Sequence, residues 1–512
     1  MKPTFYITTP IYYVNGAPHI GHANTSVAAD TVARWKRLDG FDVMFLTGTD
    51  EHGQKVEKAA ADAGLDPQAF TDQVSAQFRE MGTLMGLSND QFIRTTEPRH
   101  HAACQALWTR LLERDEIYLG QYEGWYAIRD EAFYVEDETV LRPDGVRLSV
   151  ATGAPVEWVT EPSYFFRLSA WQDRLLALYD RVPNAIMPPG RRNEIVSFVR
   201  GGLTDLSVSR TSFRWGVPVP NDPDHVMYVW LDALTNYLTA LGYPDETTDL
   251  WRFWPANVHL VGKDIIRFHA VYWPAFLMAA GLEPPLSVFA TGWWTVRGEK
   301  MSKSTGNVIP PADLVTTYGL DPVRFFLLRE VPFGNDGDFS DAALIRRMNN
   351  ELANDLGNLA QRTLSQIAKN LAGVLPDAGV PTEDDQVLLT AAQALPVALR
   401  PLMDRLALGE AIEEVWKVIR AANAYIDRQA PWALRKTDPA RMASVLRVLV
   451  DVMRPVATVL QPVMPGSMAR MLDQLGVPPD ARDIAALDAP LPGGIALPAP
   501  AGVFPRHIEA AA

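Results

Sequence analysis

The sequence predicts an α/β protein in which a parallel-sheet domain is split by an insertion and followed by an all-α helix bundle. Three observations predict this architecture. Short apolar runs alternate with helical patterns on both sides of a stretch, 117–224, that has aromatic and β-branched runs separated by turn residues. Stripes of apolar residues at helical spacing then fill 346–475. At 512 residues the chain is too long for a single core, so we expect two to four domains.

The first β-α-β unit comes from the start of the chain. Phe5 to Thr9 is an apolar run, a helical pattern begins near Ala23, and Val43 to Leu46 is a short buried run. Asp50 follows directly, at the carboxyl edge where open parallel sheets bind ligands. A carboxylate there can hold an ammonium group, although it would also serve as the N-cap of the helix expected from Gln54.

The later segments follow the same logic. Val258 to Val261 is a strand that ends at Gly262, a helix is expected over 265–280, and another strand precedes Gly292. The tail is rich in Pro, Gly and Ala, so it should be irregular and either lie along the protein or be disordered. The expected divisions are a first half of the sheet domain (1–116), the insertion (117–224), a second half (225–308), a linking region (309–345), the helix bundle (346–475) and the tail (476–512).

Composition narrows the class of protein. The chain has 47% hydrophobic and 21% charged residues, no apolar run long enough to cross a bilayer, and a start without the features of a signal peptide. The single Cys104 excludes a disulfide framework and a cysteine-cluster zinc site. We therefore expect a cytoplasmic protein.

The net charge of −14 argues against general binding to polyanions, so an RNA partner would need local basic patches. Such patches are also typical of solvated surfaces, so they are weak evidence by themselves. The candidates are Arg34 with Lys36 and Arg37, Arg191 with Arg192, Arg346 with Arg347, and Arg435 with Lys436.

Four residues, His19-Ile20-Gly21-His22, stand between the first strand and the first helix. A strand that turns and then opens a helix presents unpaired backbone N–H groups and the positive end of the helix dipole, which suits phosphate. The two imidazoles add donors, and Gly21 leaves room for a nucleotide base against the backbone. The motif indicates an ATP site, although a metal pair or two helix-capping histidines would also fit this spacing.

A second motif, Lys300-Met301-Ser302-Lys303-Ser304, lies much later in the chain, after the strand that precedes Gly292. Two lysines on a glycine-flanked loop provide the charge that a departing pyrophosphate needs. Taken alone, the same stretch could be a solvated surface turn.

In this order, the two motifs resemble the paired signatures of the class I aminoacyl-tRNA synthetases. The resemblance extends over nearly the whole chain and is closest to the methionyl-tRNA synthetases, in a form without zinc-knuckle cysteines and without a C-terminal tRNA-binding appendage. It implies a Rossmann-type catalytic domain split by a connective-peptide insertion, a stem-contact region over 309–345, and an anticodon-binding helix bundle.

The resemblance also implies a reaction. Such an enzyme activates L-methionine with ATP to methionyl-adenylate and pyrophosphate, then transfers the methionyl group to the 3′ terminal adenosine of elongator and initiator tRNA(Met). Mg²⁺ should accompany ATP. No zinc is expected, because Tyr126 to Arg129 and Val146 to Gly153, which correspond to the knuckles, have no cysteine. We expect a monomer with no membrane or DNA partner.

Site residues carry over position by position. The resemblance makes His19, His22, Lys300 and Lys303 catalytic and adds Gly21 and Asp264 to the ATP site. Asp264 would bind the ribose, unless it pairs with Lys263 as a surface ion pair. The methionine pocket would be Ile11, Tyr13, Asp50, Trp230, Ala233, Leu234, Tyr237 and His269. In that pocket Asp50 would hold the α-ammonium and the Tyr237 hydroxyl could donate to the thioether sulfur. Leu234 stands where some relatives have proline. The anticodon readers would be Asn358, Arg362, Pro431 and Trp432.

Other functions fit less of the chain. The synthetases for leucine, isoleucine and valine carry a large editing domain, and the roughly 110 residues between Arg114 and Val226 are too few for one. The cysteinyl enzyme needs cysteine ligands for zinc. Another adenylate-forming nucleotidyltransferase would share the histidine motif but would not need the bundle. A non-catalytic tRNA-binding paralogue would not need the intact histidines and lysines.

Overall fold

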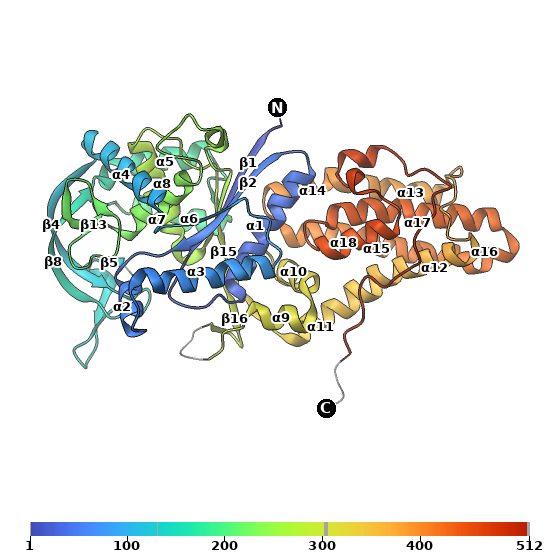
Figure 1. The fold of residues 1–512 in the computed structure, drawn as a ribbon, viewed down its shortest axis with the longest axis horizontal. Coiled ribbons are helices and arrows are strands. Elements are labelled where there is room, and N and C mark those ends of the chain that lie inside the picture. Colours follow the sequence, from blue (N-terminus) through green and yellow to red (C-terminus); the bar gives the residue numbers. More distant parts are fainter. Residues whose placement is uncertain (1, 131, 302–305, 509–512) are drawn as a thin grey trace.

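The computed structural model describes residues 2–130, 132–301 and 306–508. Within these residues, six strands form a parallel sheet in the order β3-β2-β1-β14-β15-β9 (Figure 1). Their bounds are β1 Thr4–Tyr13, β2 Asp42–Asp50, β3 Gln91–Arg94, β9 Ile186–Met187, β14 Val258–Gly262 and β15 Val288–Thr291.

The sheet is buried on both faces, as parallel sheets are. Most residues of β1 and β2 are buried, because helices cover the two sides. From β1 the chain winds toward β2 and β3 on one side, and β14 and β15 extend the sheet on the other. Neighbouring β1 and β14 therefore form the point where the winding reverses, and ligands of open α/β sheets bind in the crevice there. The helices of this part are α1 Ile20–Leu38, α2 Gln54–Asp62, α3 Pro67–Leu84, α4 Pro98–Glu113, α7 Val229–Thr239 and α8 Trp273–Ala279.

The region expected to be an insertion is built on a long antiparallel pair, β4 with β8, which curves around one end of the molecule (Figure 1). One strand from this range, β9, nevertheless joins the main sheet, where Ile186 pairs with Val288 of β15. The elements are β4 Ile117–Ala127, β5 Ala132–Tyr134, β6 Thr139–Leu141, β7 Arg147–Ser149, β8 Glu157–Phe166, α5 Gln172–Arg181, α6 Pro189–Arg200, β10 Leu206–Ser207, β11 Ser209–Arg210, β12 Pro218–Val219 and β13 Asp222–Met227.

After the sheet the chain becomes helical and extends away from it (Figure 1). The apolar stripe of Leu344, Met348, Leu352, Leu356 and Leu359 is buried along its whole length, partly through a π-helix at Met348–Gly357. The elements are β16 Trp294–Val296, β17 Glu299–Lys300, α9 Pro311–Tyr318, α10 Leu320–Arg329, β18 Gly337–Phe339, α11 Asp341–Arg347, α12 Asn358–Asn370, α13 Glu383–Gln393, α14 Leu395–Asp404, α15 Leu408–Gln429, α16 Pro431–Thr437, α17 Pro439–Leu460 and α18 Pro465–Gln474.

A buried arginine joins the sheet domain to the bundle. Arg324, on α10, donates to the carboxylate of Asp30 on α1 at 2.7 Å and to the backbone carbonyls of Met85, Pro462 and Val463 at 2.8–3.0 Å. Both Arg324 and Asp30 are fully buried. The first helix of the sheet domain is therefore held directly to the turn between α17 and α18.

The described part of the tail lies along the bundle. Backbone hydrogen bonds join Leu375 to Ile495, and the side chain of Asn349 bonds to the backbone of His507 in both directions. This agrees with the first of the two expectations for the tail. None of the helices described here combines the length and the hydropathy that a membrane crossing requires.

Candidate active site

The two histidines of the first motif cap the helix that they open. Nδ1 of His19 accepts from the backbone N–H of Gly21, and Nδ1 of His22 accepts from the backbone N–H of His19, each at 3.1 Å. The two rings lie 3.9 Å apart. Because a neutral imidazole that accepts at Nδ1 carries its proton at Nε2, both rings offer an Nε2–H donor. The capping that the sequence left open is found, and because it uses only Nδ1, the donor interpretation stays a prediction compatible with it.

Burial, with His19 beside it, keeps the pKa of His22 well below its ordinary value, so this ring is neutral at pH 7. Position 21 must be glycine for a steric reason. A Cβ at this position would lie 2.9 Å from the His19 ring, so any side chain would displace that histidine. Gly21 and His22 together thus keep both rings in their capping orientation.

The lysine loop begins beside this motif. Lys300 lies in β17, where its backbone pairs with that of Thr295. The side chain of Lys300 and all of Lys303 lie outside the described residues. The chain on either side of the loop lies against the first motif. The methyl carbon of Met301 would be 3.8 Å from a Cβ built on Gly21, and the carbonyl of Ile309 accepts a hydrogen bond from the backbone N–H of Ile20 at 3.0 Å.

Asp264 lies in a short turn directly after β14, on the other side of the crevice from β1. It is exposed and accepts a hydrogen bond from the Trp293 indole at 3.2 Å. Lys263 forms its ion pair with Asp336 instead, at 2.6 Å. The surface pair of Lys263 with Asp264 that the sequence left open is therefore not what forms.

The methionine-pocket candidates come together from four elements. Ile11 and Trp230 pack against the buried cluster that contains Leu234 and Tyr237. Ala233 is 3% exposed, and the exposed fraction is 2% or less for Leu234, Tyr237 and His269. His269 comes from a π-helix at Phe268–Tyr272, which turns its ring toward α7.

Asp50 ends β2 and pairs in register with Tyr13 of β1. The helix after it has Gly53 as its N-cap, with no side-chain cap, so Asp50 does not serve the capping role that the sequence left open. Asp50 is 7% exposed. Burial of the Tyr237 phenol, with a smaller contribution from the charge of Asp50, raises the pKa of that phenol well above its ordinary value.

The proton of the Tyr237 hydroxyl is already engaged. Nδ1 of His269 donates to the Ile265 carbonyl at 3.0 Å, which leaves Nε2 to accept from the Tyr237 hydroxyl at 2.8 Å. Burial lowers the pKa of His269 to about 4, so the ring is neutral at pH 7. In this structure the single proton of the Tyr237 hydroxyl is therefore given to His269, and its expected donation to a thioether sulfur stays a prediction.

Sequence reasoning missed three aromatic residues at this place. Phe268 stacks on Trp230 at 3.7 Å, and His259 stacks on Tyr237 at 4.0 Å while bonding to Thr8 at 2.8 Å. Trp215, from the predicted insertion, donates to the carbonyl of Glu51 at 2.6 Å. The one available signal was His259, a polar residue inside an otherwise apolar strand.

At the far end of the bundle, three of the four anticodon candidates meet. The guanidinium of Arg362 lies 5.1 Å from the ring centre of Trp432 and forms an ion pair with Asp427 at 2.5 Å. Pro431 begins α16 after Ala430, whose φ of 46° turns the chain sharply between α15 and α16. Asn358 is exposed one helical turn before Arg362 on α12. Trp432 is 41% exposed, so this face is open to a partner.

Most of the basic patches are neutralised within the protein. Arg34, Lys36 and Arg37 pair with Asp30, Asp404 and Asp90. The second and third patches also form ion pairs: Arg191 with Glu194, Arg192 with Asp180, and Arg346 and Arg347 with Glu330. Arg435 and Lys436, on the same short helix as Trp432, form no ion pair with any of the described residues. The basic candidates therefore reduce to the one beside the anticodon candidates.

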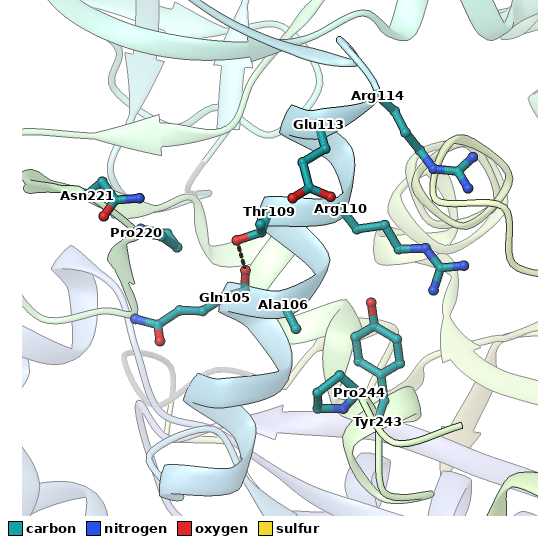
Figure 2. Close-up of a pocket in the computed structure, with 10 residues that line it drawn as sticks. All are labelled: Gln105, Ala106, Thr109, Arg110, Glu113, Arg114, Pro220, Asn221, Tyr243 and Pro244. Atoms are coloured by element: carbon teal, nitrogen blue, oxygen red, sulfur yellow. Dashed lines mark hydrogen bonds between the residues drawn. The ribbon is translucent and has the colours of Figure 1, made fainter. Parts of the chain in front are cut away.

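A cleft of about 830 Å³ lies elsewhere, along the outer face of α4. Figure 2 shows Gln105, Thr109, Arg110 and Glu113 along this face, with Tyr243 on one side. None of its residues belongs to the candidate site, and Arg110 is engaged in an ion pair with Glu246 at 2.6 Å.

Comparison with known proteins identifies relatives over the full length. Residues 5–364 match the family model described as tRNA synthetases class I (M), and residues 375–511 match the anticodon binding domain of methionyl tRNA ligase. The methionine–tRNA ligase of Mesorhizobium japonicum is 56% identical over 99% of this chain and 98% of its own length, and that of Mycobacterium tuberculosis is 54% identical over the same shares.

Solved structures show the same similarity. Mycobacterium tuberculosis methionyl-tRNA synthetase in complex with methionyl-adenylate superposes with a TM-score of 0.97 at 54% identity, covering 99% of this chain and 100% of the other. The free form of the same enzyme gives a TM-score of 0.91 at 50% identity, covering 100% and 99%.

Proposed function

The chain belongs to the methionine–tRNA ligases of the class I aminoacyl-tRNA synthetases, and on that premise we propose where each step of the reaction takes place in this fold. The enzyme activates L-methionine with ATP to methionyl-adenylate and then charges tRNA with the methionyl group. The observation that carries the proposal is the histidine pair at the start of α1, whose Nδ1 atoms accept from backbone N–H groups of the first turn and so place the ring protons at Nε2.

In the first step, a carboxylate oxygen of methionine attacks the α-phosphorus of ATP and pyrophosphate leaves. The protein supplies position and charge stabilisation more than covalent chemistry. His19 and His22 would donate from Nε2 to the phosphates, next to the backbone N–H groups of the first turn of α1. Lys300 and Lys303 would stabilise the departing pyrophosphate. Asp264, after the strand that neighbours β1, would bind the ribose.

Methionine would bind between β1, β2 and α7, with Asp50 on its ammonium group. Ala233, Leu234 and the pair of Tyr237 with His269 would enclose the side chain. Because the hydroxyl donates to His269, the polarisable sulfur of methionine would contact Tyr237 at the edge of its ring. Rejection of leucine and isoleucine then depends on the shape of a closed apolar pocket.

The tRNA anticodon would be read by the bundle, where bases can stack on Trp432 and hydrogen-bond to Asn358 and Arg362. The proposal covers elongator and initiator tRNA(Met), a monomeric enzyme and a cytoplasmic location. Mg²⁺ would be held mainly by the phosphates of ATP, because the groups that line the first motif are N–H donors, and bound there it would neutralise phosphate charge. No zinc is proposed.

Amino-acid-dependent exchange of pyrophosphate into ATP tests this function. The assay compares methionine with leucine, isoleucine, valine and cysteine, with Mg²⁺ present, both with and without a zinc chelator. Exchange with methionine alone is the expected result. Exchange with another amino acid at a comparable rate, or exchange that stops when zinc is removed, would contradict the proposed pocket or the absence of a zinc requirement.

A further inference from the structure

The chemistry proposed above leaves one fully buried carboxylate unused. Asp232 lies on α7, directly before the pocket residue Ala233, and is 0% exposed. One of its oxygens accepts from Nδ1 of His52 at 2.6 Å, and the other accepts from Nε2 of His100 at 2.7 Å. Burial alone would raise the pKa of Asp232, but the two histidines outweigh it and hold the pKa below its ordinary value. These two hydrogen bonds compensate the cost of burying the charge, because an unpaired buried carboxylate would strongly destabilise the fold.

The same residues could be taken for a metal site. Among the described residues, His100, Cys104 and Asp232 are the His, Cys, Asp and Glu side chains that lie close enough together for one ion. Two ligands of a tetrahedral zinc ion, each about 2.0 Å from the metal, are separated by about 3.3 Å. The nitrogen of His100 and the oxygen of Asp232 are only 2.7 Å apart, and the sulfur of Cys104 is 3.2 Å from the same nitrogen. These distances are those of hydrogen bonds and are too short for two ligands of one zinc ion.

Proton positions follow from this arrangement. Asp232 is ionised and can only accept, so His52 must carry a proton at Nδ1 and His100 a proton at Nε2. His100 can then accept at Nδ1 from the hydroxyl of Thr239, which is 3.1 Å away on the last turn of α7. His52 and His100 each donate one N–H to Asp232, so a side chain that cannot accept both hydrogen bonds cannot replace the carboxylate.

Two of the three segments joined by Asp232 carry residues of the proposed methionine pocket, and the third packs against one of them. His52 follows Asp50 by two residues at the end of β2, and its carbonyl accepts from the Tyr13 hydroxyl at 3.2 Å. His100 lies on α4, which packs against α7. One carboxylate therefore sets the position of the proposed ammonium-binding strand end relative to the helix that would enclose the methionine side chain.

We propose that Asp232 is a positioning residue for methionine binding: through His52 and His100 it fixes the end of β2, with Asp50, at a set distance from α7. This inference rests on the methionine pocket proposed above. It assigns no contact between Asp232 and methionine or ATP. Its effect is on the spacing of the groups that would hold the two ends of the amino acid.

The substitution Asp232→Asn tests the proposal. It keeps the size of the side chain but replaces one acceptor with an NH₂ group, which faces a histidine N–H. In pyrophosphate exchange, KM for methionine should rise about tenfold or more, as expected for a lost hydrogen bond to a charged group, while KM for ATP changes less than about twofold. Equal changes in both constants, or no change in KM for methionine, would overturn the proposal.

The matched control is Asp385→Asn, at the other end of the molecule. Asp385 is also fully buried and accepts from Arg441 and Tyr425. Both variants should lose thermal stability, but Asp385→Asn should leave KM for methionine unchanged. A rise in that constant in the control would mean that destabilisation alone produces the effect, and the proposal would fail.

Rescue variants separate positioning from packing. His52→Asn keeps an N–H close to the place of Nδ1, and His100→Gln keeps one close to Nε2, whereas His52→Ala and His100→Leu keep neither. The conservative variants should bind methionine within about threefold of the parent, and the other two should resemble Asp232→Asn. If the conservative variants are as impaired as His52→Ala and His100→Leu, the hydrogen bonds to Asp232 are not what matters.

Two further measurements distinguish the ways of failing. Asp50→Ala tests the pocket itself: if KM for methionine is unchanged there, the proposed pocket is wrong, and if it rises there but not in Asp232→Asn, only the present inference is wrong. Metal analysis of the purified protein should find no bound zinc. One equivalent of zinc that is lost in Cys104→Ser would replace the positioning network with a metal site.

Discussion

The two ends of the molecule hold their candidate residues in opposite ways. Around the proposed methionine pocket, Ala233, Leu234, Tyr237 and His269 are buried, and the Tyr237 hydroxyl is hydrogen-bonded to His269. At the far end of the bundle, Trp432 is exposed, with Arg362 lying over its ring. The difference follows from the size of what is recognised. A substrate of a few atoms is selected by enclosure, whereas unstacked bases of an RNA are met by aromatic and basic groups on the surface.

The buried charges differ in the same way. In the sheet domain the buried Asp232 is held by two histidines, and in the bundle the buried Asp385 is held by an arginine. Eight of the nine histidines precede residue 270, so nearly all the imidazoles lie before the bundle. The two ends should therefore respond differently to substitution and to pH.

The joint between the two ends is where we expect the largest effect. Arg324→Met would leave Asp30 as a buried charge without its main partner, which typically costs about 3–5 kcal/mol. The transition temperature measured by calorimetry should fall and the sheet domain and bundle should unfold in separate steps. Arg405→Met, which removes an exposed ion pair with Glu410, is the control and should cost less than about 1 kcal/mol. Equal effects of the two substitutions would show that Arg324 is not a joint.

At the active-site end, His22→Asn separates the two roles of this histidine. The amide oxygen of asparagine can still cap the His19 N–H, but the Nε2–H donor is lost. Methionyl-adenylate formation should slow by on the order of 100- to 1,000-fold, the usual effect of removing one preorganised donor, with KM for methionine little changed. His22→Gln, which keeps a donor near Nε2 and loses the cap, should retain more activity. The reverse order would make His22 a structural cap.

Lowering the pH should weaken one end before the other. The pKa of His269 is about 4 in the folded protein, because of burial, and about 6.5 in the unfolded chain, so between these values the unfolded chain binds more protons. Stability of the sheet domain should therefore rise with pH from about 4 to 6.5 and level off above, by on the order of 3 kcal/mol in total from this group.

The bundle should behave differently in that pH range. Burial tends to raise the pKa of Asp385, but Arg441 and Tyr425 hold it below its ordinary value, so its contribution is present above about pH 4 and lost only below. Hydrogen exchange, corrected for intrinsic rates, should show α7 and β14 losing protection between pH 7 and pH 4.5 while α13 and α17 keep it. Parallel losses at both ends would contradict this assignment of the buried charges.

The smallest effect is expected at the exposed end. Trp432→Ala should lower kcat/KM for tRNA charging about 10- to 100-fold, as expected from the loss of one base-stacking contact. Pyrophosphate exchange without tRNA should be unchanged, and Trp432→Phe should keep most of the charging activity. A matching loss of exchange would make Trp432 a structural residue of the bundle.

Much of the fold could be predicted from periodicity. The first β-α-β unit, the switch from sheet to bundle and the buried stripe from Leu344 to Leu359 all follow from apolar residues at strand or helix spacing. The two-residue strand β9 could not be predicted, because two residues carry no period. The π-helix that holds His269 was also missed, because its apolar pattern does not differ enough from that of an α-helix.

Residue types at the site were predicted better than their contacts. The positions of His19 and His22 after the first strand indicated their place, and the helix-capping bonds are local. Bonds between distant segments were beyond reach: nothing near Asp232 in the sequence points to His52 or His100, and nothing near Arg324 points to Asp30. The engagement of the Tyr237 proton by His269 was missed for the same reason.

A crystal structure with a non-hydrolysable methionyl-adenylate analogue would test the central claim most directly, which is that an enclosed pocket beside the β1–β14 crevice binds methionine. We expect the ammonium group on Asp50, the thioether against Tyr237 and His269, and the phosphate mimic at Nε2 of His22. An analogue seated in the cleft along α4, or with its ammonium group away from Asp50, would contradict that claim.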